Sequence, residues 1–334
     1  MSARRGIAVF VVSAVAFACS CNKGPTNEGQ SVSTSAPVHP KRATGLRIPD
    51  NLADISTETH VSATKLLSAA IKSTKNLSVK GTFQHPDFCD PSAETFSFRT
   101  QEMVTDVKDQ GECGACWAFA TNAVLESSYR LLRKENISAS EQDLISCSPE
   151  GLFGPRDCQG GWWAFDVVKK PGIESSVRYP YVAHDAECAS RPPAEFRITL
   201  TDYVQPGQKV TSVPPDTALK TAMCKHGPLA VGFDATPTFT EFGWNNHSSS
   251  SLFAESDSGE VNHGIALVGW DKDGWLIKNS WGKTWGDQGF LRVKYGTNSI
   301  GWGAAWAEAW PKDYDPPQLV RALIDKPVSS RKKQ

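Results

Sequence analysis

A cysteine at the junction of a glycine-containing turn and an apolar helix is the feature that most constrains this chain. Gly111 and Gly114 interrupt regular structure directly before Cys116. From Trp117 a largely apolar run with few helix breakers continues to about Arg133, which predicts a helix with the cysteine in its first turn. Unpaired N–H groups at a helix N-terminus stabilise anions, so we expect a lowered pKa and a reactive thiolate. The alternative for any cysteine is a buried or disulfide-bonded structural role.

A nucleophilic thiol needs a base, and the base needs a group that orients it. Among the seven histidines, only His263 lies in an apolar run typical of a strand, residues 261–270. A turn sequence and a second apolar run ending at Asn279 follow, which together predict a β-hairpin. The hairpin would return Asn279 to the neighbourhood of His263. An asparagine carbonyl can accept the imidazole N–H and fix one tautomer without adding charge.

Two separated signatures give the chain a family resemblance. Cys113-Gly-Ala-Cys-Trp117 matches the Cys-Gly-[Ser/Ala]-Cys-[Trp/Tyr] pattern, and Asn279-Ser-Trp-Gly282 lies downstream in the expected order. The chain thereby resembles the papain/cathepsin cysteine proteases, and its start suggests a bacterial exported or lipoprotein member. The resemblance implies an α+β, papain-like two-lobed fold. A helical left lobe and an antiparallel β-barrel-like right lobe would enclose the active site in a cleft.

The resemblance also implies roles for individual residues. It makes the protein a cysteine endopeptidase that uses a thiolate–imidazolium pair and a thioester intermediate, without a cofactor or metal. Its partners would be protein or peptide substrates, and we expect bulky apolar side chains two residues before the scissile bond. The catalytic residues would be Cys116, His263 and Asn279, with Gln110 binding the oxyanion and Trp281 shielding the Asn–His hydrogen bond. Substrate would bind at Gly160, Gly161, Trp162, Trp163, Val261 and Gly264.

The chain has nine cysteines, and its first residues read as a secretion signal. A basic start is followed by a short apolar stretch, residues 7–18, as in a secretion signal. This apolar stretch is too short to span a membrane. An A-x-A-like site would leave Cys19 first in the mature chain, as in a lipid-anchored protein. Cys21 is the competing lipid acceptor, and plain secretion is the alternative to both. The protein would then be extracellular, periplasmic or lipid-anchored at the cell envelope, and membrane contact would come only through the lipid.

Export allows disulfides to form. Six cysteines remain after the two near the signal and Cys116 are set aside, and six allow fifteen pairings. The resemblance selects two disulfides, Cys113–Cys158 and Cys147–Cys188, and leaves Cys89 and Cys224 as a remainder. A zinc site at Cys113-x-x-Cys116 lacks a second nearby Cys/His pair.

Composition shifts divide the chain into five expected regions. After the signal, 1–18, comes a flexible tether rich in Ser, Thr, Pro and Gly, 19–45. Residues 46–88 would be a prosegment or a spacer, with one helix that carries Leu66, Leu67, Ala70 and Ile71 on one face. The peptidase domain would span 89–311 and a tail 312–334. The segment 242–260 reads as a surface insertion, or else as a loop that overhangs the cleft.

The net charge of −1 and scattered basic residues argue against nucleic acid as a partner. Two other functions stay open at this point. A catalytically silent binding module would be expected to have lost one of the catalytic groups, whereas all are present. A transpeptidase would use the same chemistry with an amine acceptor, and the sequence does not separate it from a hydrolase. Nor does the sequence indicate an oligomeric state.

Overall fold

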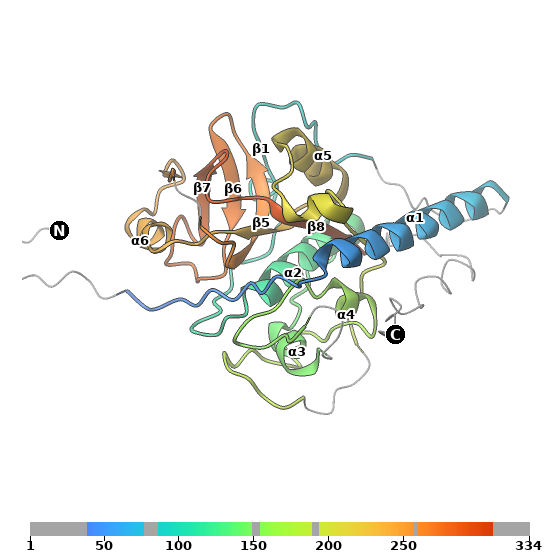
Figure 1. Cartoon of the computed structure of the whole chain (residues 1–334), viewed down its shortest axis with the longest axis horizontal. Coiled ribbons are helices and arrows are strands. Elements are labelled where there is room, and N and C mark those ends of the chain that lie inside the picture. Colours follow the sequence, from blue (N-terminus) through green and yellow to red (C-terminus); the bar gives the residue numbers. More distant parts are fainter. Residues whose placement is uncertain (1–38, 77–85, 149–153, 189–193, 257–258, 310–334) are drawn as a thin grey trace, which may run out of the picture. The chain divides into compact units, whose positions relative to one another are not determined.

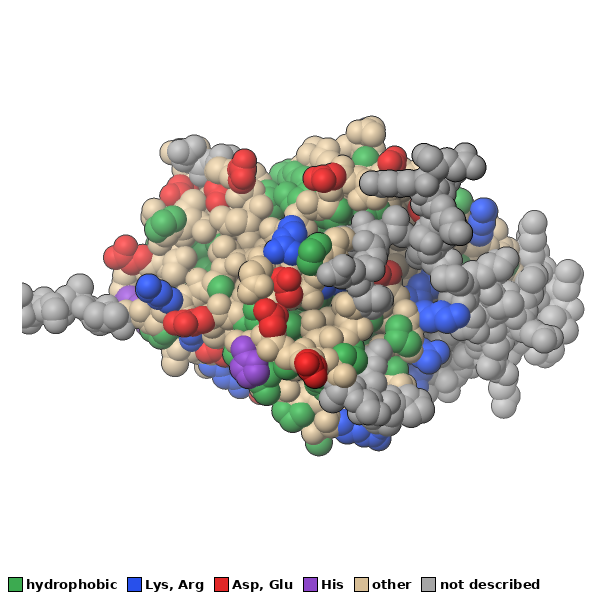
Figure 2. All heavy atoms as spheres, turned by 60° about the horizontal axis from the view of Figure 1, so that its bottom comes forward, with side chains coloured by type: hydrophobic (Ala, Val, Ile, Leu, Met, Phe, Trp, Pro, Cys, Tyr) green, Lys and Arg blue, Asp and Glu red, His purple; other side chains and the backbone are tan. Residues whose placement is uncertain are grey.

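The structure is a computed structural model that describes residues 39–76, 86–148, 154–188, 194–256 and 259–309. The expected signal, most of the tether with Cys19, and the C-terminal tail lie outside these residues. The described residues from 40 onward group into one compact unit. None of the described helices is long and apolar enough to cross a membrane. The face drawn in Figure 2 carries acidic and basic side chains scattered among other groups.

The helical lobe forms around α2 (Cys116–Ser128), which runs on into a π-helical turn, η1 (Tyr129–Arg133). The predicted helix and its end near Arg133 are therefore confirmed. Every residue of α2 is buried, because its apolar side chains pack against both lobes. Two short helices, α3 (Glu141–Cys147) and α4 (Phe165–Lys169), complete this lobe beside α2 (Figure 1). Ser140 caps α3 by accepting the Asp143 N–H.

The second lobe is a sheet. In the described residues its strand order is β2-β8-β3-β5-β6-β7-β4, with β1 also paired to β5. All pairs are antiparallel except β4 with β7. The strands are β1 (Phe96–Ser97), β2 (Leu200–Tyr203), β3 (Leu229–Phe233), β4 (Leu252–Phe253), β5 (His263–Trp270), β6 (Gly274–Lys278), β7 (Phe290–Lys294) and β8 (Trp302–Glu308). Helices α5 (Asp216–His226) and α6 (Pro237–Asn245) and the 3-10 turn η2 (Gly207–Thr211) lie between strands.

The predicted hairpin is β5 with β6, and Ala266 pairs with Lys278 near its open end. The segment 242–260, expected as a surface insertion, contains β4, which pairs with the edge strand β7, and Phe253 is buried. Arg292 of β7 also donates to the Ser250 carbonyl, so this segment is fastened to the sheet. In its described part, Glu255 also accepts from Thr236 and Asn298, so the hydrogen bonds of this segment go to the sheet lobe.

Helix α1 (Leu52–Asn76) precedes both lobes in the chain. Its residues Leu52, Ile55, Ala63 and Leu66 are buried, which is the three- to four-residue spacing of one helix face. The helix packs on β2 and η2 of the sheet lobe. Of the face expected from the sequence, Leu66 is buried and Leu67 is half-buried, and the side chains of Ala70 and Ile71 lie outside the described residues.

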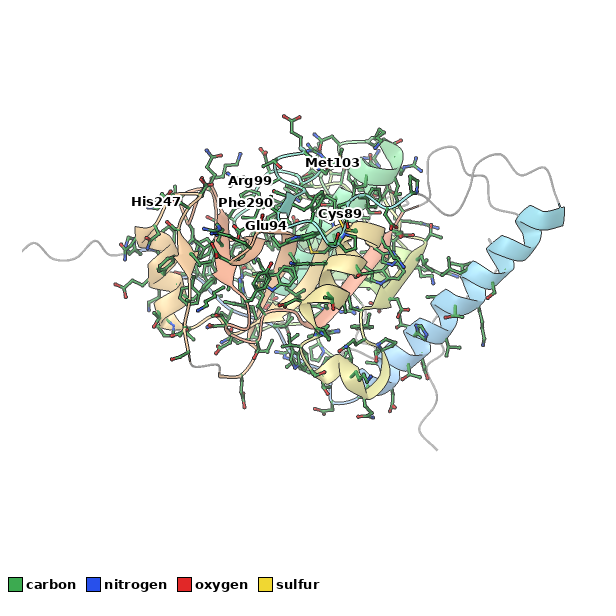
Figure 3. All side chains as sticks on the ribbon, turned by 90° about the horizontal axis from the view of Figure 1, so that it is seen from above. Cys89, Glu94, Arg99, Met103, His247 and Phe290 are labelled. Carbon is green, nitrogen blue, oxygen red and sulfur yellow. A yellow bond between two sulfur atoms is a disulfide. The ribbon has the colours of Figure 1, made fainter. Side chains whose placement is uncertain are left out.

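Three disulfides join distant segments. Cys113–Cys158 and Cys147–Cys188 occur as the family resemblance implies, and the remaining pair is Cys89–Cys224. Such bridges are typical of exported proteins. The last bridge joins the segment before β1 to α5. Arg99 lies over the Phe290 ring, 4.2 Å from its centroid (Figure 3). It also pairs with Asp287 at 2.6 Å.

Candidate active site

Cys116 is the first residue of α2, and the turn before it is rigidly held. The Gly114 N–H donates to the Cys158 carbonyl at 2.7 Å, and Cys113–Cys158 closes the same turn. Cys116 is the free cysteine among the described residues, and it is fully buried. The chain thus presents one unpaired thiol at the N-terminus of a buried helix.

Burial shifts the pKa of the Cys116 thiol in the direction opposite to the one expected. Loss of solvation raises the Cys116 pKa to about 11, although nearby backbone N–H groups of Gly264, Gly45 and Trp117 lower it. The helix N-terminus was expected to lower this pKa below its usual value. That expectation is wrong for the chain as folded, because desolvation of a fully buried thiolate outweighs a few backbone dipoles.

His263 opens β5, and Asn279 directly follows β6, so the hairpin brings the two side chains together. His263 Nε2 lies 2.9 Å from Asn279 Oδ1. Burial lowers the His263 pKa to about 4, opposed by this hydrogen bond. His263 Nδ1 is buried and has no hydrogen-bond partner within the described ranges. Trp281 stacks on the imidazole with ring centroids 4.6 Å apart and covers the histidine from one side.

Gln110 connects the helical turn to the segment after β6. Its backbone N–H donates to the Ser280 carbonyl at 2.8 Å, and its Oε1 accepts the Ser280 hydroxyl at 2.6 Å. The amide nitrogen donates to the Cys113 carbonyl at 2.8 Å and to the Ala43 carbonyl at 3.0 Å. The expected oxyanion donor therefore already donates to two carbonyl oxygens, and both belong to this chain.

The expected substrate-binding residues lie around the same place, but not all of them face it. A Cβ on Gly160 would lie 2.8 Å from the Gly45 carbonyl oxygen, and a Cβ on Gly264 would lie 2.9 Å from Trp163. Trp162 and Trp163 are fully buried, and their indole N–H groups donate to the Tyr203 hydroxyl and the Gly303 carbonyl. These two indoles therefore belong to the packed interior in this arrangement.

The segment 43–47, which spans the expected boundary between the flexible tether and the prosegment or spacer, lies against the expected active-site residues. Leu46 forms a parallel β-bridge with Gly161: the Gly161 N–H donates to the Gly45 carbonyl at 2.9 Å, and the Arg47 N–H donates to the Gly161 carbonyl at 2.8 Å. The N–H groups of Gly45 and Leu46 also donate to the Asn262 carbonyl, at 3.1 and 2.9 Å. The segment 43–47 thus contacts the expected oxyanion donor Gln110, the Cys116 thiol and the expected substrate-binding residue Gly161.

The Leu46 side chain is buried in the position where a substrate side chain would be expected. A Cβ on Gly232 would lie 3.2 Å from Leu46 Cδ2 and 2.7 Å from Val261 Cγ1. Leu46 belongs to the same apolar cluster as Trp162 and Trp163, and Val261 packs against that cluster. No periodicity in 40–48 could have indicated this, because the segment is too short and its partner is a groove elsewhere in the chain.

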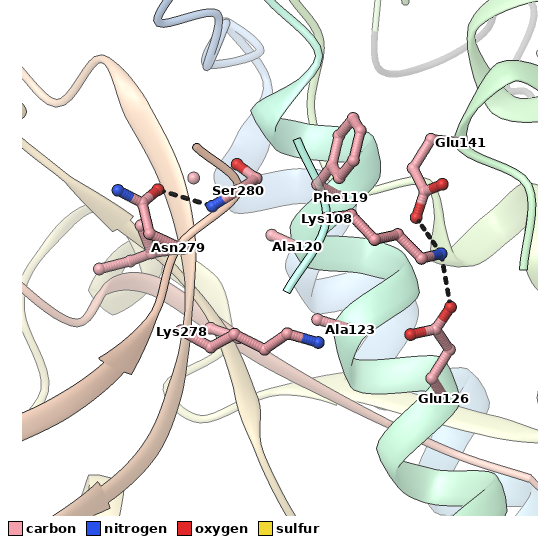
Figure 4. A pocket seen from close by; sticks show the side chains of 12 residues that line it. Lys108, Phe119, Ala120, Ala123, Glu126, Glu141, Lys278, Asn279 and Ser280 are labelled. Carbon is pink, nitrogen blue, oxygen red and sulfur yellow. Dashed lines mark hydrogen bonds and ion pairs between the residues drawn. The ribbon is translucent and has the colours of Figure 1, made fainter. Parts of the chain in front are cut away.

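A buried charge cluster lies behind the site, between α2 and β6 (Figure 4). Lys108 Nζ lies 2.7 Å from Glu126 and 2.7 Å from Glu141. Lys278 Nζ donates to the Thr105 hydroxyl at 2.9 Å, and that hydroxyl donates to Glu126. Burial lowers the Lys278 pKa to about 8 and raises the Glu141 pKa. The cluster joins α2 to the segments that carry Gln110 and Asn279.

No group of three His, Cys, Asp or Glu side chains suited to a metal occurs among the described residues. A cysteine at a helix N-terminus, beside a histidine held by an asparagine, is the arrangement of thiol-dependent enzymes with a helical and a sheet lobe.

The sequence matches the family described as "Papain family cysteine protease" over residues 92–307. The chain belongs to this family. It is 38% identical over 207 residues to cathepsin S of Mus musculus, covering 60% of this chain and 58% of that protein. It is 35% identical to digestive cysteine proteinase 2 of Homarus americanus, covering 63% and 64%.

Solved structures agree in fold. Bromelain from Ananas comosus, in complex with the E64 inhibitor, matches with a TM-score of 0.55 and 28% identity, covering 65% of this chain and 99% of that one. Digestive procathepsin L 3 of Tenebrio molitor matches with a TM-score of 0.56 and 26% identity, covering 75% and 90%. The papain-like α+β fold is thereby confirmed. The chain spans 58 to 64% of the length of the curated relatives named above.

Proposed function

We propose that this protein is a cysteine endopeptidase, a hydrolase of peptide bonds. The observation that carries the proposal is the His263–Asn279 hydrogen bond, together with the free thiol of Cys116, which meets the backbone N–H of Gly264, the residue after His263. An amide oxygen can only accept, so His263 Nε2 carries the proton and Nδ1 is left as the base. Membership in the papain family supports the same chemistry.

In the proposed mechanism, Cys116 gives its proton to His263, and the thiolate attacks a peptide carbonyl carbon. The resulting oxyanion would be held by the Gln110 amide and the Cys116 backbone N–H. The imidazolium then protonates the leaving amine, which leaves a thioester on Cys116. His263 takes a proton from water as that water attacks the thioester, and the acid is released with the thiol restored. Asn279 orients His263 throughout, and Trp281 covers their hydrogen bond.

The test uses the full chain with Gly45→Val, because a side chain there would overlap the Gly114 carbonyl and should clear the cleft. We expect this variant to hydrolyse a fluorogenic peptide and to be labelled at Cys116 by a thiol-directed epoxide, located by mass spectrometry. Adding Cys116→Ala should abolish both signals, with an unchanged circular dichroism spectrum. Turnover that persists without Cys116 would refute the assignment.

The substrate preference we propose is a bulky apolar side chain two residues before the scissile bond. The burial of Leu46 between Gly232 and Val261 supports it, since that space accepts a branched apolar group. Substrate backbone would pair with Gly160 and Gly161 next to this space. A peptide-library profile of the Gly45→Val variant would measure the preference, and an acidic or basic optimum there would contradict it.

We further propose that the protein is exported, as a bacterial secreted or lipid-anchored enzyme. The three disulfides support export. Lipidation at Cys19, with Cys21 as the alternative acceptor, would anchor the chain to a membrane. Mass spectrometry of the N-terminal peptide from expressing cells, wild type against Cys19→Ala, distinguishes the two acceptors and plain secretion. The peptidase domain would span 89–311, preceded by the prosegment or spacer 46–88 and followed by the tail 312–334.

A further inference from the structure

Arg42 lies directly before the segment 43–47, and two residues far away in the chain bind its guanidinium. The guanidinium donates to Asp109 Oδ2 at 2.8 Å, and its central carbon lies 5.6 Å from the centroid of the Trp244 ring. The Arg42 side chain is only 10% exposed, whereas that of Asp109 is 45% exposed. Asp109 and Trp244 together thus provide a guanidinium site, one carboxylate and one aromatic face.

Both residues of the guanidinium site are held in place by contacts that do not involve the arginine. Asp109 Oδ1 accepts the Gly111 N–H at 2.9 Å. Trp244 belongs to α6 and is buried. Its neighbour Gly243 packs so closely on Trp285 that a Cβ on Gly243 would overlap that ring. The carboxylate and the indole are therefore preorganised, and a guanidinium that binds there does not have to order them.

The guanidinium site lies on the side of the cleft that would receive the leaving amine. Asp109 forms an isolated β-bridge with Trp281, the ring that covers His263. In the proposed mechanism His263 protonates the leaving amine, so the part of a substrate that follows the scissile bond would lie towards Trp281. Leu46 lies at the opposite side, next to Gly161. A substrate side chain that reaches Asp109 would therefore come after the scissile bond.

The spacing along the chain limits how far the guanidinium site lies from the reacting bond. The Gly45 N–H contacts the Cys116 sulfur, and Arg42 is three residues away. An extended strand advances about 3.3 Å per residue, so the Cα atoms of Arg42 and Gly45 lie within about 10 Å of each other. A substrate backbone need not follow the path of 43–47, because the site is made of side chains. An arginine at one of the first three positions after the scissile bond can reach it.

We propose that Asp109 and Trp244 form a specificity site that selects arginine at one of the first three positions after the scissile bond. The inference rests on the proposed function of the same cleft. Asp109 supplies a charge-assisted hydrogen bond and Trp244 a cation–π contact, so arginine binds better than a neutral side chain of the same shape. Lysine binds less well, since its ammonium is a strongly hydrated point charge without a flat face.

Internally quenched peptides measure this preference in the double variant Arg42→Ala with Gly45→Val. The first change removes the guanidinium that fills the site, and the second should clear the cleft. Each peptide carries leucine two residues before the scissile bond and either arginine or citrulline at one of the three positions after it. Citrulline has nearly the same shape as arginine but no charge. We expect kcat/KM to be about 10-fold higher with arginine at one of these positions, because a hydrogen bond to a charged group is lost with citrulline.

Variants of the two site residues assign the preference. Asp109→Asn should abolish it, because the amide keeps an acceptor for Gly111 but loses the charge. Trp244→Leu removes the ring face and should reduce the arginine-to-citrulline ratio by about two- to fivefold. Asp106→Asn is the matched control on the same segment, since Asp106 is 90% exposed and pairs with Lys283. Its ratio should stay within about twofold of the parent's. The ratio compares two peptides on one protein, so it does not depend on how fully the cleft is open.

A second measurement does not need turnover. The same peptides with an N-methylated scissile amide are added while iodoacetamide alkylates Cys116, and the alkylation rate is followed by mass spectrometry. We expect the arginine peptide to protect Cys116 at a concentration about 10-fold lower than the citrulline peptide. Asp109→Asn should remove this difference.

The outcomes separate this inference from the proposed function. Hydrolysis with equal kcat/KM for arginine and citrulline at all three positions would overturn the inference and leave the peptidase function standing. A preference that survives in both Asp109→Asn and Trp244→Leu would also overturn it. Selective protection by the arginine peptide, without hydrolysis of any peptide, would support the site and count against the peptidase function. The absence of both hydrolysis and selective protection would contradict both.

Discussion

At the scale of single residues, the hydrogen bond between His263 and Asn279 determines which imidazole nitrogen carries the proton. Nε2 must donate to the amide oxygen, so Nδ1 is unprotonated in the neutral ring. Buried Nδ1 has no hydrogen-bond partner among the residues that the structure describes, which leaves it available as a base. The orientation of the histidine is thus fixed before any substrate is bound.

Asn279→Ala in the Gly45→Val chain should lower kcat/KM by about 10–100-fold, as is typical when a group that orients a histidine is lost. The pH dependence should change as well, because the imidazole can adopt either tautomer. Steady-state kinetics between pH 4 and 9 would measure both effects. Asn245→Ala, at an exposed position of α6, is the control and should leave the profile unaltered. An unchanged kcat/KM for Asn279→Ala would contradict the orienting role.

The thiol supplies a second prediction, on pH. Burial raises the Cys116 pKa to about 11 in the closed chain, so the protonated form is favoured at every pH below that value. The intact chain should therefore be alkylated slowly at pH 7, with a rate that rises only towards pH 11. In Gly45→Val, entry of water removes much of the desolvation, and the rate should rise at a lower pH. Coincident pH profiles for the two chains would count against this account.

At the scale of elements, α1 is held by a stripe of apolar side chains, so its stability depends on the body of the protein. Leu66→Ala removes a buried side chain at this contact and should weaken docking of α1 by about 2–5 kcal/mol. The alkylation rate of Cys116 in the full chain should then rise. Lys65→Ala changes the adjacent exposed residue and is expected to have no such effect. Equal rates for both variants would mean that α1 does not hold the segment 43–47.

The elements also differ in how far the sequence predicts them. Helix α2 and the β5–β6 hairpin were predicted because their apolar periodicity and turn residues are local. The pairing of His263 with Asn279 follows from the hairpin. The placement of Gly45 and Leu46 was missed, because a short polar segment in a groove takes its conformation from its partner. The pKa of Cys116 was missed for a related reason, since its burial comes from segments far away in the chain.

At the scale of the whole molecule, Cys89–Cys224 ties the start of the catalytic unit to α5 across 135 residues of sequence. Closing so long a loop restricts the unfolded chain, and loss of a native disulfide typically costs about 2–5 kcal/mol. The double variant Cys89→Ser with Cys224→Ser should unfold at a lower temperature, by about 2–4 °C per kcal/mol. Differential scanning calorimetry measures this shift. An unchanged Tm would show that the disulfide adds nothing to the stability that the surrounding contacts already provide.

The closeness of Gly45 to Gly114 has one more consequence. The path through the cleft at that point has room for a backbone but not for a Cβ, because a side chain on Gly45 would overlap the Gly114 carbonyl oxygen. An ordinary peptide, with side chains at every position, must therefore bind in the cleft along a path different from that of 43–47. The backbone of 43–47 cannot serve as a template for that of a substrate. An inhibitor designed by copying 43–47 would need a glycine at the position of Gly45. An analogue with a larger residue at that position would test whether the gap beside the Gly114 carbonyl can widen.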